Sequence, residues 1–279
     1  MKYSDNKFDK FYTNRDIAKL CIEKTFEIIP KNKRQFFIEP SAGSGVFLQF
    51  LNNEKYLAFD IEPEIQSNNQ NIKIQKKDFL TLTNLDLCDR INFDNTIVIG
   101  NPPFGLSSNL AIKFFNKSAE FSNYIAFILP KTFRKISVHN KLNLNFHLIK
   151  DFDIPKNSFI YNNEKYDVPT CFQIWEKRCD KRVICKINNN EKLISFVKKN
   201  EAEFAIRRVG GRAGKLLDGL NYSESSTYFC KINDKNKEYE LMQLLKKIDF
   251  SNIVNQTAGV RSLSKIELLN ELNTKYERI

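Results

Sequence analysis

Short apolar runs alternate with segments of helical periodicity over the first two thirds of the chain, and this alternation constrains the fold most. Seven runs have the length and composition of strands, at residues 36–38, 56–59, 72–74, 96–99, 125–129, 146–149 and 171–175. Between them, segments 16–29 and 109–121 carry apolar residues at helical spacing. This order predicts an α/β fold, a Rossmann-like, doubly wound, seven-stranded parallel sheet with crossover helices. Ligands of such sheets bind beyond the carboxyl ends of the strands.

The character of the chain changes near residue 180. Strand-like runs at 204–209 and 227–232 flank a Gly-Gly turn, and helical segments follow at 240–247 and 264–272. We therefore expect two domains, residues 1–180 and 181–279, the second a smaller α+β region. Lys and Arg outnumber Asp and Glu by 11 in the chain and by 7 within residues 181–279, which favours an anionic partner.

Several classes of protein do not fit the sequence. Its longest apolar runs are strand-length, so we expect no membrane span, and the polar segment Met1–Lys10 does not resemble a secretory signal. The six cysteines form no CxxC pair, which is typical of reduced cytosolic thiols and gives no reason to expect a metal. A cytoplasmic protein is the expectation.

A glycine-rich turn over residues 40–45 follows the first predicted strand and Glu39. Glycines in such a turn let the backbone approach a ligand closely. The next strand ends in Asp60, about 20 residues on, where a carboxylate can accept hydrogen bonds from ribose hydroxyls. Asp78 and Phe79 follow the third strand and could contact an adenine ring. Each acid alone could merely cap a loop, but their order favours an adenosyl ligand.

The strand at 96–99 opens directly into Asn101-Pro102-Pro103-Phe104. The prolines fix the backbone and remove hydrogen-bond donors, which leaves carbonyl oxygens free to face a cavity. The oxygens of Asn101 and Pro102 can accept the two hydrogens of a planar amine, and Phe104 offers a flat face to an extruded base. The alternative is a proline-stiffened turn without function.

Together these motifs resemble the gamma-ordered class of adenine-N6 methyltransferases that act on nucleic acids. The resemblance covers roughly residues 8–176, with Phe11-Tyr12-Thr13 as the first cofactor motif. It implies S-adenosylmethionine as cofactor and transfer of its methyl group to the N6 amine of a flipped adenine. The cofactor-binding residues that it implies are Tyr12, Thr13, Glu39, Pro40, Ser41, Ala42, Gly43, Gly45, Asp60, Ile61, Asp78, Phe79 and Asn101.

The catalytic residues that the resemblance implies are Asn101, Pro102, Pro103, Phe104 and Phe159. Phe159 stands for the second aromatic that holds the flipped base in this family. It is favoured over Tyr161, and the alternative is that Phe159 belongs to the core. A cytosine-C5 enzyme is disfavoured because the chain has no Pro-Cys dipeptide to supply the nucleophile.

The segment Gly210–Lys215 superficially resembles a phosphate-binding loop, but its spacing is one residue short and Leu216 stands where Ser or Thr should follow. A basic turn suits contacts to nucleic-acid phosphates instead, and a solvated basic hairpin is the alternative. The predicted nucleic-acid-binding residues are Arg207, Arg208, Arg212, Lys215 and Arg261.

Four functions therefore compete. A DNA adenine-N6 methyltransferase is favoured, with residues 181–279 as a target-recognition region and a possible separate restriction or recognition subunit. An RNA adenine-N6 methyltransferase is the first alternative, a protein glutamine methyltransferase the second, and a degenerate fold that only binds partners the third.

Overall fold

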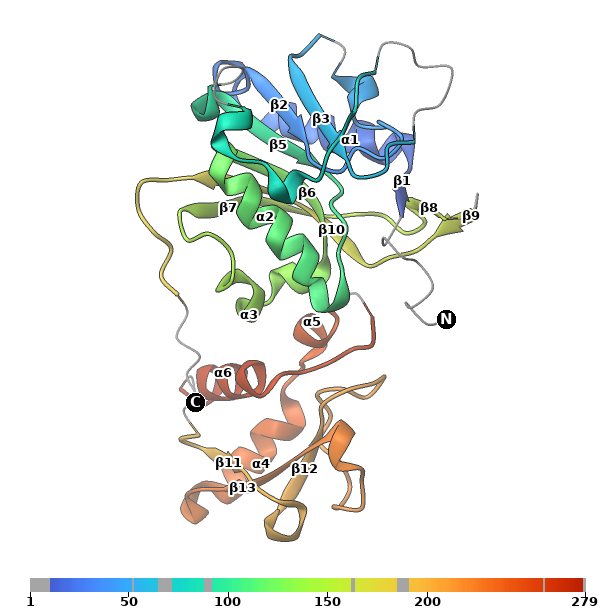
Figure 1. Ribbon diagram of the computed structural model, residues 1–279. Helices are drawn as coiled ribbons and strands as arrows, with labels where there is room; N and C mark the ends of the chain where they lie inside the picture. Colours follow the sequence, from blue (N-terminus) through green and yellow to red (C-terminus); the bar gives the residue numbers. More distant parts are fainter. Residues whose placement is uncertain are drawn as a thin grey trace. The chain divides into compact units, whose positions relative to one another are not determined.

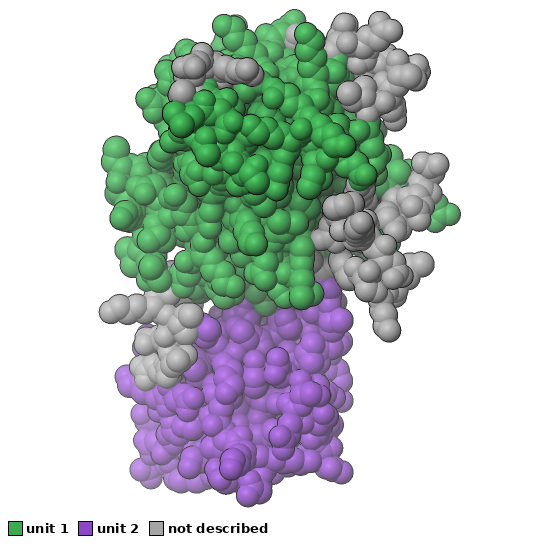
Figure 2. All heavy atoms as spheres, viewed as in Figure 1, with its two compact units in different colours: residues 1–184 green, residues 185–279 purple. Residues whose placement is uncertain are grey.

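The computed structural model describes residues 11–51, 53–64, 72–87, 92–161, 164–184, 191–257 and 259–277. The chain divides into two compact units, residues 1–184 and 185–279 (Figure 2). This division lies close to the boundary expected at residue 180, while the roles assigned to the two parts stay predictions. The prediction for Met1–Lys10 concerns residues outside the described ones.

A seven-stranded sheet with the order β4-β3-β2-β5-β6-β10-β7 forms the centre of the first unit (Figure 1). Strand β2 pairs in parallel with β3 and β5, and β5 pairs in parallel with β6. This sheet confirms the predicted Rossmann-like α/β class. Its strands are β2 (Phe36–Glu39), β3 (Tyr56–Asp60), β4 (Gln75–Lys76), β5 (Thr96–Gly100), β6 (Tyr124–Pro130), β7 (Phe146–Asp153) and β10 (Thr170–Lys177).

Strand β10 departs from the expected parallel sheet because it runs antiparallel to both neighbours. Cys171 stands opposite Leu129 of β6 on one side and Asp153 of β7 on the other. The apolar pattern could not reveal this direction. A strand buried on both faces reads as a continuous apolar run whichever way it points.

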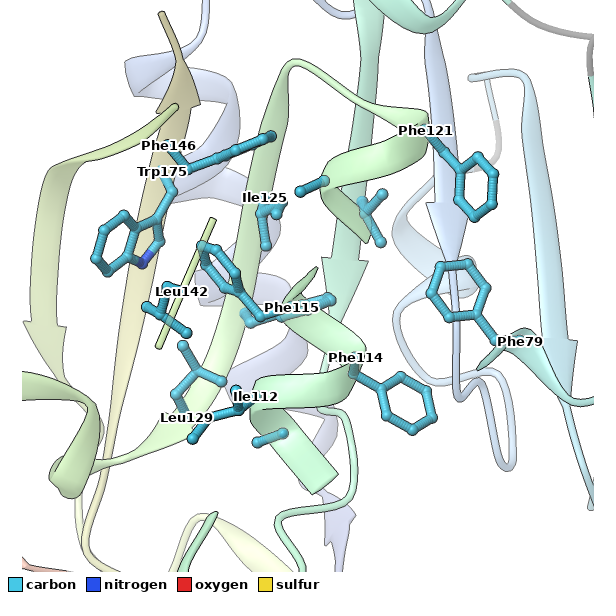
Figure 3. Close-up of a cluster of buried hydrophobic side chains, with 14 of the residues drawn as sticks. Phe79, Ile112, Phe114, Phe115, Phe121, Ile125, Leu129, Leu142, Phe146 and Trp175 are labelled. Carbon is cyan, nitrogen blue, oxygen red and sulfur yellow. The ribbon is translucent and has the colours of Figure 1, made fainter. Parts of the chain in front are cut away.

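Two helices cover opposite faces of the sheet. Helix α1 (Arg15–Ile28) begins after Asn14, whose side chain accepts a hydrogen bond from the Asp16 backbone N–H. Alternate residues of β5 point to opposite sides, so that Ile97 and Ile99 pack in the core beneath α1 and Val98 packs in the core beneath α2 (Asn109–Phe121). Figure 3 shows the second core, where aromatic side chains of α2 pack between β6, β10 and the segment after β4.

The expected crossover helices are only partly present. In residues 40–51 and 53–55, between β2 and β3, the described chain forms turns and the 3-10 turn Leu48–Phe50 rather than an α-helix. The strand expected at 72–74 is displaced, because pairing with β3 occurs at Gln75–Lys76. A short helix, α3 (Ile136–His139), follows β6.

A separate three-stranded sheet, not anticipated from the sequence, has the order β1-β8-β9. It consists of β1 (Tyr12–Thr13), β8 (Phe159–Tyr161) and β9 (Glu164–Tyr166). Thr13 stands opposite Phe159, so this sheet ties the start of the described chain to the β7–β10 connection.

The second unit contains an antiparallel sheet with the order β11-β13-β12. Strands β12 (Phe204–Arg207) and β13 (Thr227–Ile232) were expected, whereas β11 (Ile194–Phe196) was not. Helices α4 (Glu238–Lys247), α5 (Ser251–Val254) and α6 (Lys265–Tyr276) complete the unit. Ser264 and Glu267 form a capping box that fixes the start of α6. Leucines of α4 and α6 share one core with the sheet.

Across both units, no helix in the described part of the chain is long and apolar enough to span a bilayer.

Candidate active site

A cavity of about 410 Å³ lies in the first unit, where β2, β3 and β5 end. Carboxyl ends of parallel strands meet at one edge of a sheet, so the loops that follow these strands converge there. The cavity is lined by residues 11–13, 39–44, 46–47, 60–62, 78–80, 101–105, 110 and 114. Nearly all residues predicted to bind the cofactor are among them. Gly45 is not, although it lies in the same turn.

Two glycines shape this cavity through conformations that other residues rarely adopt. Gly43 has a φ of +52°, and a β-carbon there would lie 3.3 Å from the ring of Tyr12. Gly105 has a φ of +67°, and a β-carbon there would lie only 2.7 Å from Cβ of Leu110. The glycine-rich turn and the Asn-Pro-Pro-Phe loop therefore both depend on the absence of a side chain.

Asp60 connects the end of β3 to the glycine-rich turn. Its Oδ2 accepts a hydrogen bond from the backbone N–H of Gly43, and its Oδ1 accepts one from that of Glu62, both at 2.7 Å. A carboxylate can accept about four hydrogen bonds, so both oxygens keep acceptor capacity toward the cavity. Asp60 thus shapes the turn in addition to its predicted contact with ribose. Glu62 also lines the cavity and was not identified from the sequence.

Glu39 is an almost completely buried acid in the wall of the cavity, with 2% of its surface exposed. Its Oε2 accepts no hydrogen bond from any group that the structure describes. Burial, and then the charge of Asp60, raise the pKa of Glu39 well above its ordinary value. A buried carboxyl oxygen without a described partner is costly and suits a cation or a hydrogen-bond donor.

The side-chain amide of Asn101 is hydrogen-bonded through its nitrogen, while its oxygen can accept a hydrogen bond from a ligand. Its Nδ2 donates to the carbonyl oxygen of Phe11 at 3.2 Å, whereas its buried Oδ1 has no hydrogen-bond partner in the described structure. Ser41 Oγ donates to the Asn101 carbonyl at 3.3 Å and so joins the loops after β2 and β5. Pro102, Pro103 and Phe104 line the cavity beside this amide. The arrangement can accept hydrogen bonds from an amine that lies against a flat ring.

Phe159 is placed differently from the prediction. It lies in β8 with 1% of its surface exposed, packs in the core beneath α1 and does not line the cavity. Pairing of β8 with β1 places this ring in the core, which favours the alternative that Phe159 is a core residue, and its stacking on a base stays a prediction. The side chain of Tyr161, the other candidate, lies outside the described structure.

Phe11 is an aromatic residue of the cavity wall that had no predicted role beyond its place in the first cofactor motif. Its ring stacks on Tyr166 of β9, with centroids 5.1 Å apart and 12° between the planes. The sequence feature that could have identified Phe11 as a cavity residue is its position next to Tyr12 and Thr13.

In the second unit, backbone pairing brings Arg261 to the Gly-Gly loop. The Gly210 N–H donates to the Arg261 carbonyl at 2.9 Å, and Leu263 N–H donates to the Arg208 carbonyl at 2.8 Å. Of the predicted nucleic-acid-binding residues, only Arg207 is half-buried, and its Nη1 donates to Ser226 Oγ at 2.6 Å. The other four, Arg208, Arg212, Lys215 and Arg261, are exposed.

Comparison with known proteins gives one curated relative and several structures of similar fold. Ribosomal RNA small subunit methyltransferase A of Mycoplasma capricolum subsp. capricolum is 24% identical over 259 residues, covering 86% of this chain and 89% of the relative. No family model matches the chain.

Solved structures are more distant. A Listeria monocytogenes protein assigned to the class I S-adenosylmethionine-dependent methyltransferases is 15% identical with a TM-score of 0.48, covering 64% of this chain and 65% of its own. This chain therefore spans slightly less than two thirds of that protein. The 23S rRNA methyltransferase ErmE is 14% identical with a TM-score of 0.41, covering 65% of this chain and 78% of its own. At these identities the likeness concerns the fold alone.

Proposed function

We propose that this chain is an S-adenosylmethionine-dependent methyltransferase that acts on the N6 amine of adenine in a nucleic acid. The observation that carries the proposal is the Asn101 amide. Its nitrogen is bound to the Phe11 carbonyl, and its buried oxygen is left without a described partner in a cavity that Phe104 also lines. Leaving such a buried acceptor unsatisfied costs about 1–3 kcal/mol, so a ligand that donates a hydrogen bond to it is stabilised there.

The cavity has the groups that S-adenosylmethionine requires. This cofactor supplies an activated methyl group on a positively charged sulfur. Glu39 offers a buried carboxyl group without a described partner at Oε2, which suits a cationic ligand. Gly43 lets the backbone approach the ligand, while Asp60 and Asp78 offer acceptors to hydroxyl and amine groups.

The residues of the Asn-Pro-Pro-Phe loop act by positioning. Asn101 Oδ1 and the Pro102 carbonyl accept the two hydrogens of the adenine amine, which draws its nitrogen toward tetrahedral geometry and exposes the lone pair. Phe104 supports the base through stacking, worth about 1–3 kcal/mol. Fixed acceptors of this kind speed the reaction because they do not have to reorient as the transition state forms.

RNA is the proposed substrate, in place of the DNA that the sequence motifs favoured. The curated relative is named for ribosomal RNA, and the alignment covers most of both chains. The exposed cations Arg212 and Arg261 suit the phosphates of either polymer. DNA is therefore the alternative outcome of the experiment.

The test incubates the full chain with radiolabelled S-adenosylmethionine and, separately, total RNA, single-stranded DNA or duplex DNA, followed by digestion to nucleosides. Label in N6-methyladenosine supports the proposal, and label in N6-methyldeoxyadenosine assigns DNA instead. Loss of the fixed acceptor in Asn101→Ala should lower kcat by about 10²–10³-fold. Asn252→Ala, which changes an exposed residue of α5, is the matched control. Absence of label from every nucleic acid, with cofactor binding intact by equilibrium dialysis, would refute the proposal.

A further inference from the structure

Leu106 is the residue that follows the cavity-lining Gly105, and 87% of its surface is exposed. A single exposed leucine is ordinary on a protein surface. Leu106 differs because it lies two residues from Phe104, the ring proposed to support the base, and because the backbone on both sides of it is fixed.

The turn that carries Leu106 has an unusual backbone. Ser107 and Ser108 have φ values of +54° and +64°, in the left-handed region that residues with a side chain seldom adopt. Such conformations persist only where the surroundings determine them, and they concentrate at functional sites. Together with Gly105, they turn the chain outward at Leu106.

Contacts on both sides hold this turn in place. The Phe104 carbonyl accepts hydrogen bonds from the backbone N–H groups of Leu110 and Ala111, at 3.1 and 3.2 Å. Ser108 is buried, and its Oγ lies 2.7 Å from Thr132 Oγ1 in the loop after β6. An apolar side chain is thus presented to solvent on a fixed support beside the cavity.

We propose that Leu106 is a wedge that enters the base stack of the nucleic acid and fills the gap left when the target adenine moves into the cavity. The inference rests on the proposed function and adds a positioning residue to it. A base that reacts at its exocyclic amine must leave the stack, and proteins that separate base steps insert apolar side chains such as leucine. The wedge lowers the cost of extrusion because an apolar group, rather than water, occupies the vacated space.

The test compares two versions of one RNA hairpin that contains the methylated site mapped in the labelling experiment. In one the target adenine is paired within the stem, and in the other it is an unpaired bulge. Because an unpaired base is already easier to extrude, Leu106→Ala should lower kcat/KM about tenfold on the paired version and less than about twofold on the bulge. Leu106→Met should restore activity on the paired version. Leu85→Ala, which changes a leucine that is 85% exposed and does not line the cavity, is the matched control.

A second measurement does not depend on methyl transfer. With 2-aminopurine at the target position of the paired hairpin, fluorescence should rise when wild-type protein binds and extrudes the base. This rise should be lost in Leu106→Ala and retained in Leu85→Ala.

The outcomes separate the two proposals. Equal losses on paired and bulged hairpins, or no loss on either, would overturn the wedge while leaving the methyltransferase assignment in place. Absence of label from every nucleic acid in the labelling experiment would refute the proposed function, and the wedge with it.

Discussion

Replacement of Glu39 by glutamine should remove a pH dependence of stability that the fold creates. Burial and the nearby charge of Asp60 raise the pKa of Glu39 above its ordinary value of 4.5. At a pH between the ordinary and the raised pKa, Glu39 therefore stays protonated in the native state, whereas in the unfolded chain it has released its proton. Stability from this group is fully present below pH 4.5 and is lost as pH rises toward the native pKa.

The size of this pH dependence follows from the single proton that Glu39 binds. Between the two pKa values the native state binds one more proton than the unfolded state, so the unfolding free energy falls by about 1.4 kcal/mol per pH unit. Glutamine cannot ionise, so Glu39→Gln should lack this slope. Its buried amide nitrogen lowers stability by about 1–3 kcal/mol at every pH, which leaves the comparison of slopes unaffected.

The assay is urea unfolding between pH 5 and pH 8, followed by tryptophan fluorescence. The chain has a single tryptophan, Trp175, which is buried in the first unit, so the signal reports the unit that contains Glu39. Glu23→Gln, which changes an exposed residue of α1, is the control and should retain the wild-type slope.

Ligand binding extends the test. A cationic ligand favours ionised Glu39, so wild-type protein should bind S-adenosylmethionine more tightly as pH rises, and Glu39→Gln should not show this increase. Parallel stability profiles for wild type and Glu39→Gln over the whole range would refute the reasoning, since they would mean that Glu39 titrates alike in both states.

Three further results are expected. Gly105→Ala should lower kcat by about 10²-fold in the labelling assay because its β-carbon would displace the loop from Leu110, and wild-type activity would contradict the tight geometry. Phe121→Ala should lower the unfolding free energy of the first unit by about 3–5 kcal/mol in urea, since its ring is fully buried; a loss below about 1 kcal/mol would show that the core closes around the gap. Replacing Arg212 and Arg261 by alanine should reduce the slope of log affinity for RNA against log salt by about 1–2, measured by fluorescence anisotropy, and an unchanged slope would exclude both from phosphate contacts.

Local patterns account for much of the first unit. Helix α2 occupies the range expected from its apolar spacing, and β5 extends the expected strand by one residue to Gly100. The motifs after β2, β3 and β5 line one cavity, as expected when parallel strands end at one edge of a sheet. Such features depend on residues close together in the sequence.

Tertiary structure decided the rest. The reversed direction of β10 depends on its pairing with β6 and β7, and the burial of Phe159 depends on the pairing of β8 with β1. The Asn101 amide is oriented by the Phe11 carbonyl, 90 residues away, which binds its nitrogen and leaves its oxygen without a partner among the described residues. The sequence by itself determined which segments form strands, helices and ligand-binding turns, because periodicity and turn chemistry are local. Only the tertiary structure decided which acceptors are buried without partners among the described residues and which rings face the cavity, because these properties come from contacts between distant segments.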